Sequence, residues 1–413
     1  MRDEMKKVPR LRFRGFQEDW ELCKVGDFGR EIYGGGTPKT SVKEFWSGTL
    51  PWIQSSDLKE DKVCDIKAKK YISIKAIQQS SAKKISKNSI AIVTRVGVGK
   101  LALMPYEYAT SQDFLSISVL QVDKWFGVYS LYNKLQSELN SVQGTSIKGI
   151  TKDELLNKKI MIPKPLKEQS KIGLFLKKID TTTALHQRKL DQLKELKKVY
   201  LQVMFPQKDE TVPRMRFANF TGEWEQRELG SIGNTFTGLT GKAKEDFGHG
   251  DARFITYLNV FQNAVTSLEQ LDSIEIDLKQ NEVRKGDVFF TTSSETPDEV
   301  GMSSVWKYDC DNIYLNSFTF GYRPIIEFDL DYLASMLRSN AVRKKIIFLA
   351  QGISRYNISK TKMMNIEVPI PSLSEQAKIG AYLSNIEKTI ALHQNKLNQL
   401  KSLKKSYLQN MFI

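Results

Sequence analysis

Two stretches of the chain, 168–205 and 375–412, place apolar residues at alternating spacings of three and four positions. In the first stretch the repeat runs through Ile172, Leu176, Ile179, Thr183, His186, Leu190, Leu193, Lys197, Tyr200 and Met204. In the second it runs through Ile379, Leu383, Ile386, Ile390, His393, Leu397, Leu400, Lys404, Tyr407 and Met411. This spacing is the seam of a coiled coil. Because neither stretch contains proline, and each has a single glycine near its start, each is predicted to form one long helix.

Histidine and lysine interrupt both seams at matching places, at His186 and Lys197 and again at His393 and Lys404. Single polar positions in such a seam tend to fix the register of the paired helices at some cost in stability. We therefore interpret both histidines as packing or register positions instead of catalytic groups.

Four leucines flank the seams and are expected to widen the apolar face: Leu185, Leu196, Leu392 and Leu403. A lone helix cannot bury such a stripe, so the two helices are predicted to pack against each other as an antiparallel pair. At about 1.5 Å rise per residue, 38 residues span roughly 57 Å, an upper bound of about 17 base pairs at about 3.4 Å per step. The pair would then act as a ruler.

Short apolar stretches outside these helices predict β-strands at 89–94, 115–120, 287–292 and 317–322. Helical patterns occur near 125–142 and 329–350. Each block ahead of a long helix is therefore expected to be α+β. Both blocks run to a Pro-x-Pro hinge, Pro163/Pro165 and Pro369/Pro371, which is expected to stop the last strand and start the helix.

The chain repeats itself. Comparison of 168–205 with 375–412, without gaps and at an offset of 207, gives 25 identities in 38 positions. A fainter repeat at an offset of 204 opens each block: Val8-Pro9-Arg10, Arg12-Phe13, Phe16 and Trp20-Glu21 match Val212-Pro213-Arg214, Arg216-Phe217, Phe220 and Trp224-Glu225. Self-similarity at a fixed period indicates a duplicated unit. The predicted fold is α+β, with two pseudo-repeated α/β blocks (1–166 and 207–372) joined by two long helices (167–206 and 373–413) that form an antiparallel coiled coil.

The net charge is the unusual feature of the composition. Sixty-two Lys and Arg against 47 Asp and Glu give +15 and a pI near 9.4. A basic excess of this size favours a polyanionic partner, most often nucleic acid, although a solvated lysine-rich surface explains the charge equally well. Three cysteines and three histidines, scattered along the chain, argue against a disulfide framework or a metal site. The start of the chain lacks the apolar core of a signal peptide and no apolar run approaches about 18 residues, so we expect a cytoplasmic protein without a membrane partner.

Several catalytic motifs are present only in part. Gly97-Val98-Gly99-Lys100 resembles the end of a P-loop, but Thr94 and Leu101 stand where that motif needs glycine and Ser or Thr. Pro297-Asp298 lacks the acid-x-Lys half of a metal-dependent nuclease motif, and the chain has no Pro-Pro dipeptide for an amino-methyltransferase signature. We expect that this chain catalyses nothing by itself.

Two basic blocks and two repeated helices without an active site resemble the specificity subunit of type I restriction–modification systems, over essentially the whole chain. The resemblance is carried by the duplicated block openings, Gly34-Gly35-Gly36-Thr37-Pro38, Phe45-Trp46, Leu50-Pro51-Trp52, Gln112-Asp113-Phe114, and the Pro-x-Pro, Glu-Gln and Lys-Ile-Gly pattern at each helix start. Block two departs from the Gly-Gly-Thr-Pro pattern with Thr237-Gly238-Leu239-Thr240-Gly241-Lys242, which different DNA targets would predict.

The resemblance implies that each block is a target recognition domain that reads one half of a bipartite double-stranded DNA sequence. It implies that the helices set the gap between the halves and dock two methyltransferase subunits, with restriction subunits as a further component. S-adenosylmethionine, ATP and Mg²⁺ would belong to those partner subunits, with no cofactor in this chain.

Base edges and phosphates are read by Arg, Lys, Asn, Gln, Ser and Thr on loops. Candidates in block one are Thr37, Lys39, Gln54, Ser55, Arg95, Lys100, Gln112, Ser146 and Lys148. Candidates in block two are Thr240, Lys242, Asn259, Thr292, Ser293, Ser294, Asn316, Arg323, Ser354, Arg355 and Asn357. Lys148 and Arg355 rank highest because they lie in equivalent closing loops. Trp46 and Trp52 could pack on a sugar or frame a loop, but as aromatic residues they are more often core residues.

Two other functions remain open at this point. A coiled-coil scaffold that presents two protein-binding domains explains the helices but not the basic excess. An enzyme with an unfamiliar site would transfer methyl groups without a partner. The strong salt dependence of DNA binding separates the first of these from DNA recognition.

Overall fold

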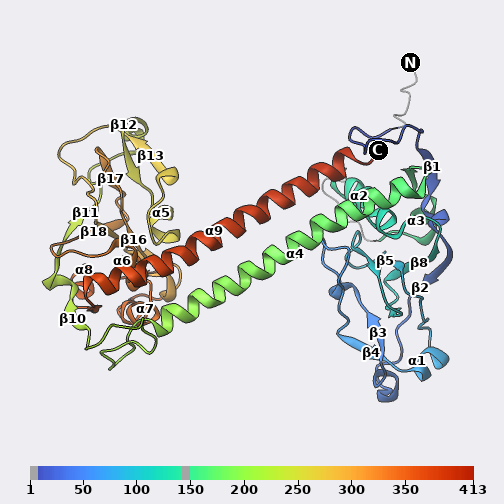
Figure 1. Ribbon diagram of the computed structural model, residues 1–413, viewed down its shortest axis with the longest axis horizontal. Helices are drawn as coiled ribbons and strands as arrows, with labels where there is room; N and C mark the ends of the chain where they lie inside the picture. Colours follow the sequence, from blue (N-terminus) through green and yellow to red (C-terminus); the bar gives the residue numbers. More distant parts are fainter. Residues whose placement is uncertain (1–7, 142–148) are drawn as a thin grey trace. The chain divides into compact units, whose positions relative to one another are not determined.

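The computed structural model describes residues 8–141 and 149–413, which divide into two compact units (Figure 1). Unit 1 comprises Met1–Gln187 and Asn395–Ile413, and unit 2 comprises Arg188–Gln394. Each unit is built from one of the two blocks and from parts of both long helices. The boundary between the units therefore falls within the helices.

Unit 1 contains three sheets in the order β1-β9, β2-β8-β5-β6 and β4-β3-β7. Its strands are β1 (Glu21–Lys24), β2 (Gly29–Gly34), β3 (Leu50–Ile53), β4 (Lys70–Ile72), β5 (Ser89–Val93), β6 (Leu101–Met104), β7 (Ala109–Thr110), β8 (Phe114–Leu120) and β9 (Lys159–Ile162). Its helices are α1 (Ile74–Gln79), α2 (Lys124–Ser141), α3 (Lys152–Asn157) and the first part of α4 (Leu166–Val203). The core lies between the four-stranded sheet, α2, α4 and the last residues of α9 (Leu373–Asn410).

Unit 2 repeats this topology with β10-β20, β11-β18-β14-β16 and β13-β12-β17, and adds the short pair β15-β19. Its strands are β10 (Glu225–Glu228), β11 (Gly233–Thr237), β12 (Phe247–Ile255), β13 (Leu271–Ile274), β14 (Val288–Thr291), β15 (Ser293–Ser294), β16 (Ser303–Val305), β17 (Ile313–Leu315), β18 (Thr319–Pro324), β19 (Tyr356–Asn357) and β20 (Glu367–Ile370). Its helices are α5 (Tyr257–Gln262), α6 (Leu330–Leu337), α7 (Asn340–Phe348), α8 (Lys360–Met364) and the first part of α9. The parallel pairing of β3 with β7 recurs as β12 with β17. The predicted duplication and the α+β fold are therefore confirmed, although the middles of the two blocks share little sequence.

The four predicted strands correspond to β5, β8, β14 and β18, and the helical pattern near 125–142 corresponds to α2. The pattern near 329–350 forms two helices instead of one. The break occurs because Ser339 caps a new helix, with its side chain accepting a hydrogen bond from the Val342 backbone N–H. A serine in that position satisfies a helix start better than a helix interior.

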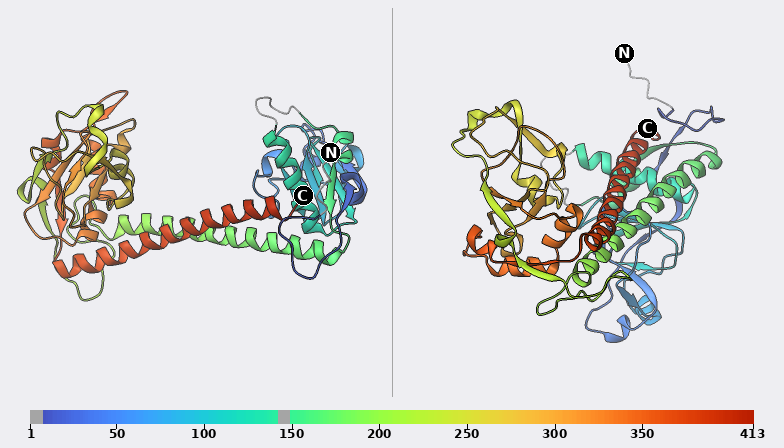
Figure 2. Two further views of the ribbon diagram at one scale, coloured as in Figure 1. Left: turned by 90° about the horizontal axis from the view of Figure 1, so that it is seen from above. Right: turned by 60° about the vertical axis from the view of Figure 1, so that its left-hand side comes forward.

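Both predicted long helices are present, and in each unit they run side by side in opposite directions (Figure 1 and Figure 2). In unit 1, Phe175 packs edge-on against Tyr407 with ring centroids 4.8 Å apart. In unit 2, Tyr200 packs in the same way against Tyr382 at 5.1 Å. The two contacts join equivalent positions of the repeat, so each unit contains the same local helix pairing.

The lysine of each seam is paired with an acid on the other helix. In unit 1, Lys404 Nζ lies 2.7 Å from Asp180 Oδ1, and both side chains are mostly buried. In unit 2, the equivalent Lys197 pairs with Glu387. A charge in a seam is stable only opposite its partner, so these pairs favour one register over its neighbours.

The four flanking leucines do not widen the buried face. Leu185, Leu196, Leu392 and Leu403 are 62%, 40%, 68% and 43% exposed. The expectation was wrong because the aromatic pairs and the Lys–acid pairs already fill the contact between the helices, which leaves the flanking positions on the solvent side.

The opening of each block is fastened to the start of its long helix by a buried ion pair. The Arg12 guanidinium donates to both carboxylate oxygens of Glu168, at 2.7 and 2.9 Å, and the Glu168 side chain is fully buried. In unit 2, Arg216 holds Glu375 in the same way at 2.7 and 2.8 Å. A bidentate pair of this kind fixes both distance and orientation.

The next repeated residues of the helix fasten a second element. The Gln169 side chain accepts a hydrogen bond from the Asp123 N–H at the start of α2 and donates to the Pro163 carbonyl. One turn later, a Cβ on Gly173 would lie 2.4 Å from the Phe126 nitrogen. Gly173 therefore lets the start of α2 lie directly against α4. Gln376 and Gly380 make the same arrangement with α6.

Replacement of Glu168 by alanine is expected to lower the free energy of unfolding of unit 1 by about 3 kcal/mol, because it leaves the mostly buried Arg12 charge without its carboxylate. Urea unfolding followed by circular dichroism measures the change.

The matched control is Glu107→Ala. It breaks the Lys84–Glu107 pair, in which both side chains are half exposed, and is expected to change stability by no more than about 0.5 kcal/mol. Equal stability of the two variants would contradict the role of Glu168.

Candidate nucleic-acid interface

The candidate residues of unit 1 gather where several strands end. β2 ends where β8 begins, because Gly34 pairs with Leu115, and β5 ends at the same place, with Val93 opposite Phe114. The second sheet joins this end through the parallel pair Ile53 and Thr110. The loops that follow these strands carry the seven candidates that the structure describes: Thr37, Lys39, Gln54, Ser55, Arg95, Lys100 and Gln112. We refer to this region as the loop end of unit 1.

Two tryptophans hold the loop after β2. The buried Trp52 donates its indole N–H to the Gly36 carbonyl at 3.1 Å, and Trp46 donates to the Lys39 carbonyl at 3.2 Å. The two rings pack edge-on with centroids 4.9 Å apart. Both tryptophans thus hold the loop, while the Lys39 side chain is exposed. Trp52 is a core residue, as the sequence favoured, whereas Trp46 is only half-buried.

Unit 2 has the same backbone framework at its own loop end. Gly36 N–H donates to the Thr110 carbonyl in unit 1, and Leu239 N–H donates to the Leu315 carbonyl in unit 2. The preceding glycine approaches the neighbouring turn equally closely in both, since a Cβ on Gly35 or Gly238 would meet a carbonyl oxygen at 1.8 or 2.0 Å. The first two positions of the Gly-Gly-Thr-Pro pattern therefore keep their backbone contacts in block two. The backbones differ at the fourth position, where Gly241 has a φ of +64° that Pro38 cannot adopt.

The closing loop of each block docks on the loop after the central strand. Ile150 N–H donates to the Thr94 carbonyl in unit 1, and Ile358 N–H donates to the Thr292 carbonyl in unit 2. In unit 2 this brings Arg355 to within 3.2 Å of the Ser293 hydroxyl. Ser354, Arg355 and Asn357 are all exposed. Ser146 and Lys148, the candidates of the other closing loop, lie outside the described residues.

Several polar candidates of unit 2 are occupied within the chain. The Asn259 side chain is buried and donates to the Ser267 and Gln270 carbonyls, and Asn316 is buried with its amide on the Ile255 carbonyl. Lys242 forms an ion pair with Asp277 at 2.8 Å, which depresses the pKa of that carboxyl. The structure therefore uses these three side chains to shape the loops.

The loops after β14 carry smaller hydroxyl groups. Thr292 donates its hydroxyl to the Phe318 carbonyl, and Ser294 donates to the Thr296 carbonyl. Thr240 is exposed, while its backbone N–H and carbonyl are both bound by the Gln280 side chain. Thr292, Thr240 and the buried Ser293 all lie at the loop end of unit 2, with Arg355.

Arg323 does not lie at this end. It stands near the other end of β18, opposite Asn234, and its guanidinium holds the buried Asp287 carboxylate through two bonds of 2.7 Å. The Asp287 contact also raises the pKa of Arg323. The Arg323 guanidinium is therefore bound inside unit 2. It lies at the opposite end of the strand from the other candidates.

The polar search of the sequence missed Phe318, which is 63% exposed in the turn between β17 and β18. It also missed Tyr257, whose hydroxyl donates to the Ser293 carbonyl. A sequence does not distinguish an exposed phenylalanine from a buried one, because burial depends on residues that are distant along the chain.

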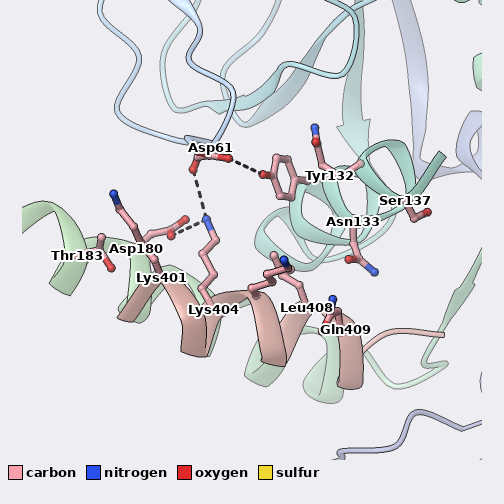
Figure 3. A pocket seen from close by; sticks show the side chains of 12 residues that line it. Asp61, Tyr132, Asn133, Ser137, Asp180, Thr183, Lys401, Lys404, Leu408 and Gln409 are labelled. Atoms are coloured by element: carbon pink, nitrogen blue, oxygen red, sulfur yellow. Dashed lines mark hydrogen bonds and ion pairs between the residues drawn. The ribbon is translucent and has the colours of Figure 1, made fainter. Parts of the chain in front are cut away.

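A cavity of about 460 Å³ lies in unit 1 between α2, α4 and α9 (Figure 3). Several of its polar lining residues bind one another. Lys404 bridges Asp180 and the Asp61 carbonyl, and the Tyr132 hydroxyl donates to Asp61 Oδ1 at 3.3 Å. The Tyr129 hydroxyl donates to Asp180 at 2.7 Å, and burial together with that carboxylate raises the pKa of Tyr129. The network is structural and links block one to both helices.

Two of the cysteines, Cys23 and Cys64, have the properties of packing residues and not of reactive thiols. Burial raises the pKa of Cys64 to about 12 and that of Cys23 to about 11, so neither thiol is an activated nucleophile. Within residues 8–141 and 149–413, no three His, Cys, Asp or Glu side chains are grouped to hold a metal ion. In the same part of the chain, no helix has the length and apolar character needed to cross a membrane.

Comparison with known proteins agrees with this architecture. Residues 17–195 and 221–402 each match the family model of the type I restriction modification DNA specificity domain. The MjaVIII specificity subunit of a type I restriction enzyme from Methanocaldococcus jannaschii is 22% identical over 403 residues, or 95% of this chain and 91% of that protein. The MjaIX specificity subunit of the same organism is 29% identical over 195 residues, which cover 45% of this chain and only 43% of that protein.

Among solved structures, the S subunit of a type I restriction–modification system from M. genitalium has the same fold. It matches with a TM-score of 0.62 at 13% identity, and the match covers 98% of this chain and 99% of that one. With both blocks matched by the family model, the chain belongs to the family of type I restriction–modification DNA specificity proteins and carries two copies of their domain.

Proposed function

We propose that this chain is the non-catalytic specificity subunit of a type I restriction–modification complex, in which each unit reads one half of a bipartite DNA sequence. The observation that supports this best is the pair of loop ends. In both units the same backbone hydrogen bonds hold the loops, while the exposed side chains differ. A scaffold of fixed loops with variable side chains suits the reading of two different sequences on one fold.

Charge supports DNA as the partner. The chain carries +15, and Lys39 and Arg95 in unit 1 and Arg355 in unit 2 are exposed at the loop ends. Arginine and lysine at such positions can bind phosphates or guanine edges. Alternation of these cations with the hydroxyl groups of Ser55, Thr240 and Ser354 gives both phosphate contacts and base contacts.

The helices supply a surface for partner proteins in this proposal. Unit 1 exposes Leu185 of α4 and Leu403 of α9, and unit 2 exposes the equivalent Leu392 and Leu196. Exposed leucines at repeated positions offer the same apolar contacts once in each unit. Two copies of one methyltransferase subunit would therefore find equivalent docking surfaces, and the helices that carry them would set the gap between the half-sites.

The chemistry resides in the partners under this proposal. The methyltransferase subunits would hold S-adenosylmethionine and extrude the adenine, as enzymes that modify a base in a duplex must do. ATP and Mg²⁺ would serve a restriction subunit. This chain would contribute sequence recognition and placement.

Expression of the chain with its methyltransferase partner is expected to produce methylated adenines at one bipartite motif, with a fixed gap and modification on both strands. Single-molecule sequencing of the host DNA measures this directly. An active methyltransferase whose methylated motif does not depend on this chain would instead favour a protein-interaction scaffold.

Alanine at Arg355 is expected to weaken DNA binding and to reduce the slope of log affinity against log salt by about one unit, because one phosphate contact is lost. A fluorescence titration of the complex at several salt concentrations gives the slope. Lys285→Ala is the matched control, since Lys285 is an exposed cation just before the opposite end of β14. An unchanged slope and affinity for Arg355→Ala would remove this residue from the interface.

The double substitution Leu185→Glu and Leu403→Glu is expected to reduce the number of bound methyltransferase subunits from two to one, because it places charge on the docking surface of unit 1 alone. Native mass spectrometry counts the subunits. Ile74→Glu introduces charge at an exposed position on α1 of the same unit and should leave both subunits bound. Retention of two subunits by the leucine variant would exclude these positions from docking.

A further inference from the structure

One turn of the loop end has the same backbone in both units and a different chemical character. In unit 1, Thr94 donates its N–H and its hydroxyl to the Asp113 carbonyl, at 2.7 and 3.1 Å. In unit 2, Thr292 donates the same two groups to the Phe318 carbonyl, at 3.3 and 2.9 Å. Asp113 and Phe318 are therefore equivalent positions, one acidic and one aromatic.

The turn that carries Phe318 is fixed from several sides. The buried Asn316 donates its amide to the Ile255 carbonyl at 2.9 Å, and its side-chain oxygen accepts the Phe318 N–H at 2.9 Å. Thr319 closes the turn by donating its hydroxyl to the Asn316 carbonyl at 3.1 Å. The backbone of this turn is held in place before any partner binds, so binding does not have to order it.

The phenyl ring is not used inside the unit. Phe318 is 63% exposed, whereas Phe320, two residues later on β18, is 3% exposed and stacks on Phe290. In unit 1, the Asp113 carboxylate is used locally, accepting a hydrogen bond from the Ser111 hydroxyl. A single exposed apolar side chain is ordinary on a protein surface, so the place of this ring among the candidate interface residues carries the argument.

The neighbours of Phe318 belong to the candidate interface. Thr292 is bonded to its carbonyl, and the next residue, Ser293, accepts a hydrogen bond from Arg355. The ring is thus an apolar group among residues of the types that bind phosphates and bases. In the major groove of DNA the apolar feature of a base edge is the C5-methyl group of thymine, and phenylalanine is one of the side chains that contact it.

We propose that Phe318 is a specificity-determining residue of unit 2, and that it contacts the C5-methyl group of a thymine in the half-site that this unit reads. The inference rests on the proposed function and adds to it the chemical identity of one recognised group. Asp113 gives unit 1 a turn that cannot make this contact, which is one physical reason for the two half-sites to differ.

The test uses the full chain assembled with its methyltransferase partner. The DNA duplexes carry the sequence motif at which the complex methylates adenine. Each thymine of both half-sites is replaced in turn by deoxyuridine, which keeps the base pair and removes only the methyl group. One replacement is expected to weaken binding by the wild-type complex about fourfold, the effect of one buried methyl-sized group. Phe318→Ala is expected to bind the thymine and deoxyuridine duplexes equally.

Ile325→Ala is the matched control. Ile325 is 66% exposed and follows the opposite end of β18, so this variant should keep the wild-type preference for thymine. The inference would be overturned if Phe318→Ala kept the fourfold discrimination. It would also be overturned if deoxyuridine weakened binding at no thymine, or if the half-site of unit 2 contained no thymine. Wild-type complex that binds the motif no better than scrambled DNA would overturn the proposed function itself, a separate result.

Discussion

The fold depends on one buried interaction, the two-pronged bond between an arginine in the opening segment and a glutamate in the first turn of a long helix. Arg12 with Glu168 and Arg216 with Glu375 tie a segment of irregular chain to a rigid element 156 and 159 residues away in sequence. Removal of these carboxylates from water is unfavourable and becomes acceptable only with full pairing. Each arginine is therefore stable only beside its glutamate. This pairing sets the orientation of each block on its helix.

The same logic separates frame from surface at the loop ends. Backbone hydrogen bonds, tryptophan N–H groups and buried asparagine amides determine where the loops lie, and each of these groups is satisfied inside the unit. The exposed side chains lie outside that frame or bind only a neighbouring hydroxyl, as Gln112 binds Thr37 and Arg355 binds Ser293. They can change without a change of fold, which is the property that a pair of domains with different targets requires.

Periodicity was enough to predict the long helices, the main strands and the duplication, because these depend on patterns within one segment. It could not identify Asp180 and Glu387 as the partners of the seam lysines, since these pairs lie across two helices. It also misjudged Leu185 and its equivalents, because spacing alone does not say which flank of a seam faces water. At the loop ends, residue type was a weaker guide still. An asparagine that satisfies a backbone carbonyl, as Asn316 does, and one that reads a base look alike in a sequence, and the aromatic Phe318 was outside a search for polar groups.

The two units differ in when they can be completed during synthesis. Unit 2 is one continuous stretch, and Phe205, which packs against Trp224 and Tyr332, is made before the rest of its core. Unit 1 takes Leu408, Met411 and Phe412 into its core, with Phe412 against Phe126 at 5.6 Å. Its first 187 residues must therefore leave the ribosome and wait, with that part of the apolar core uncovered, while the other unit is made. Contacts of such long sequence separation form slowly, so the half that is translated first is the half that finishes folding last.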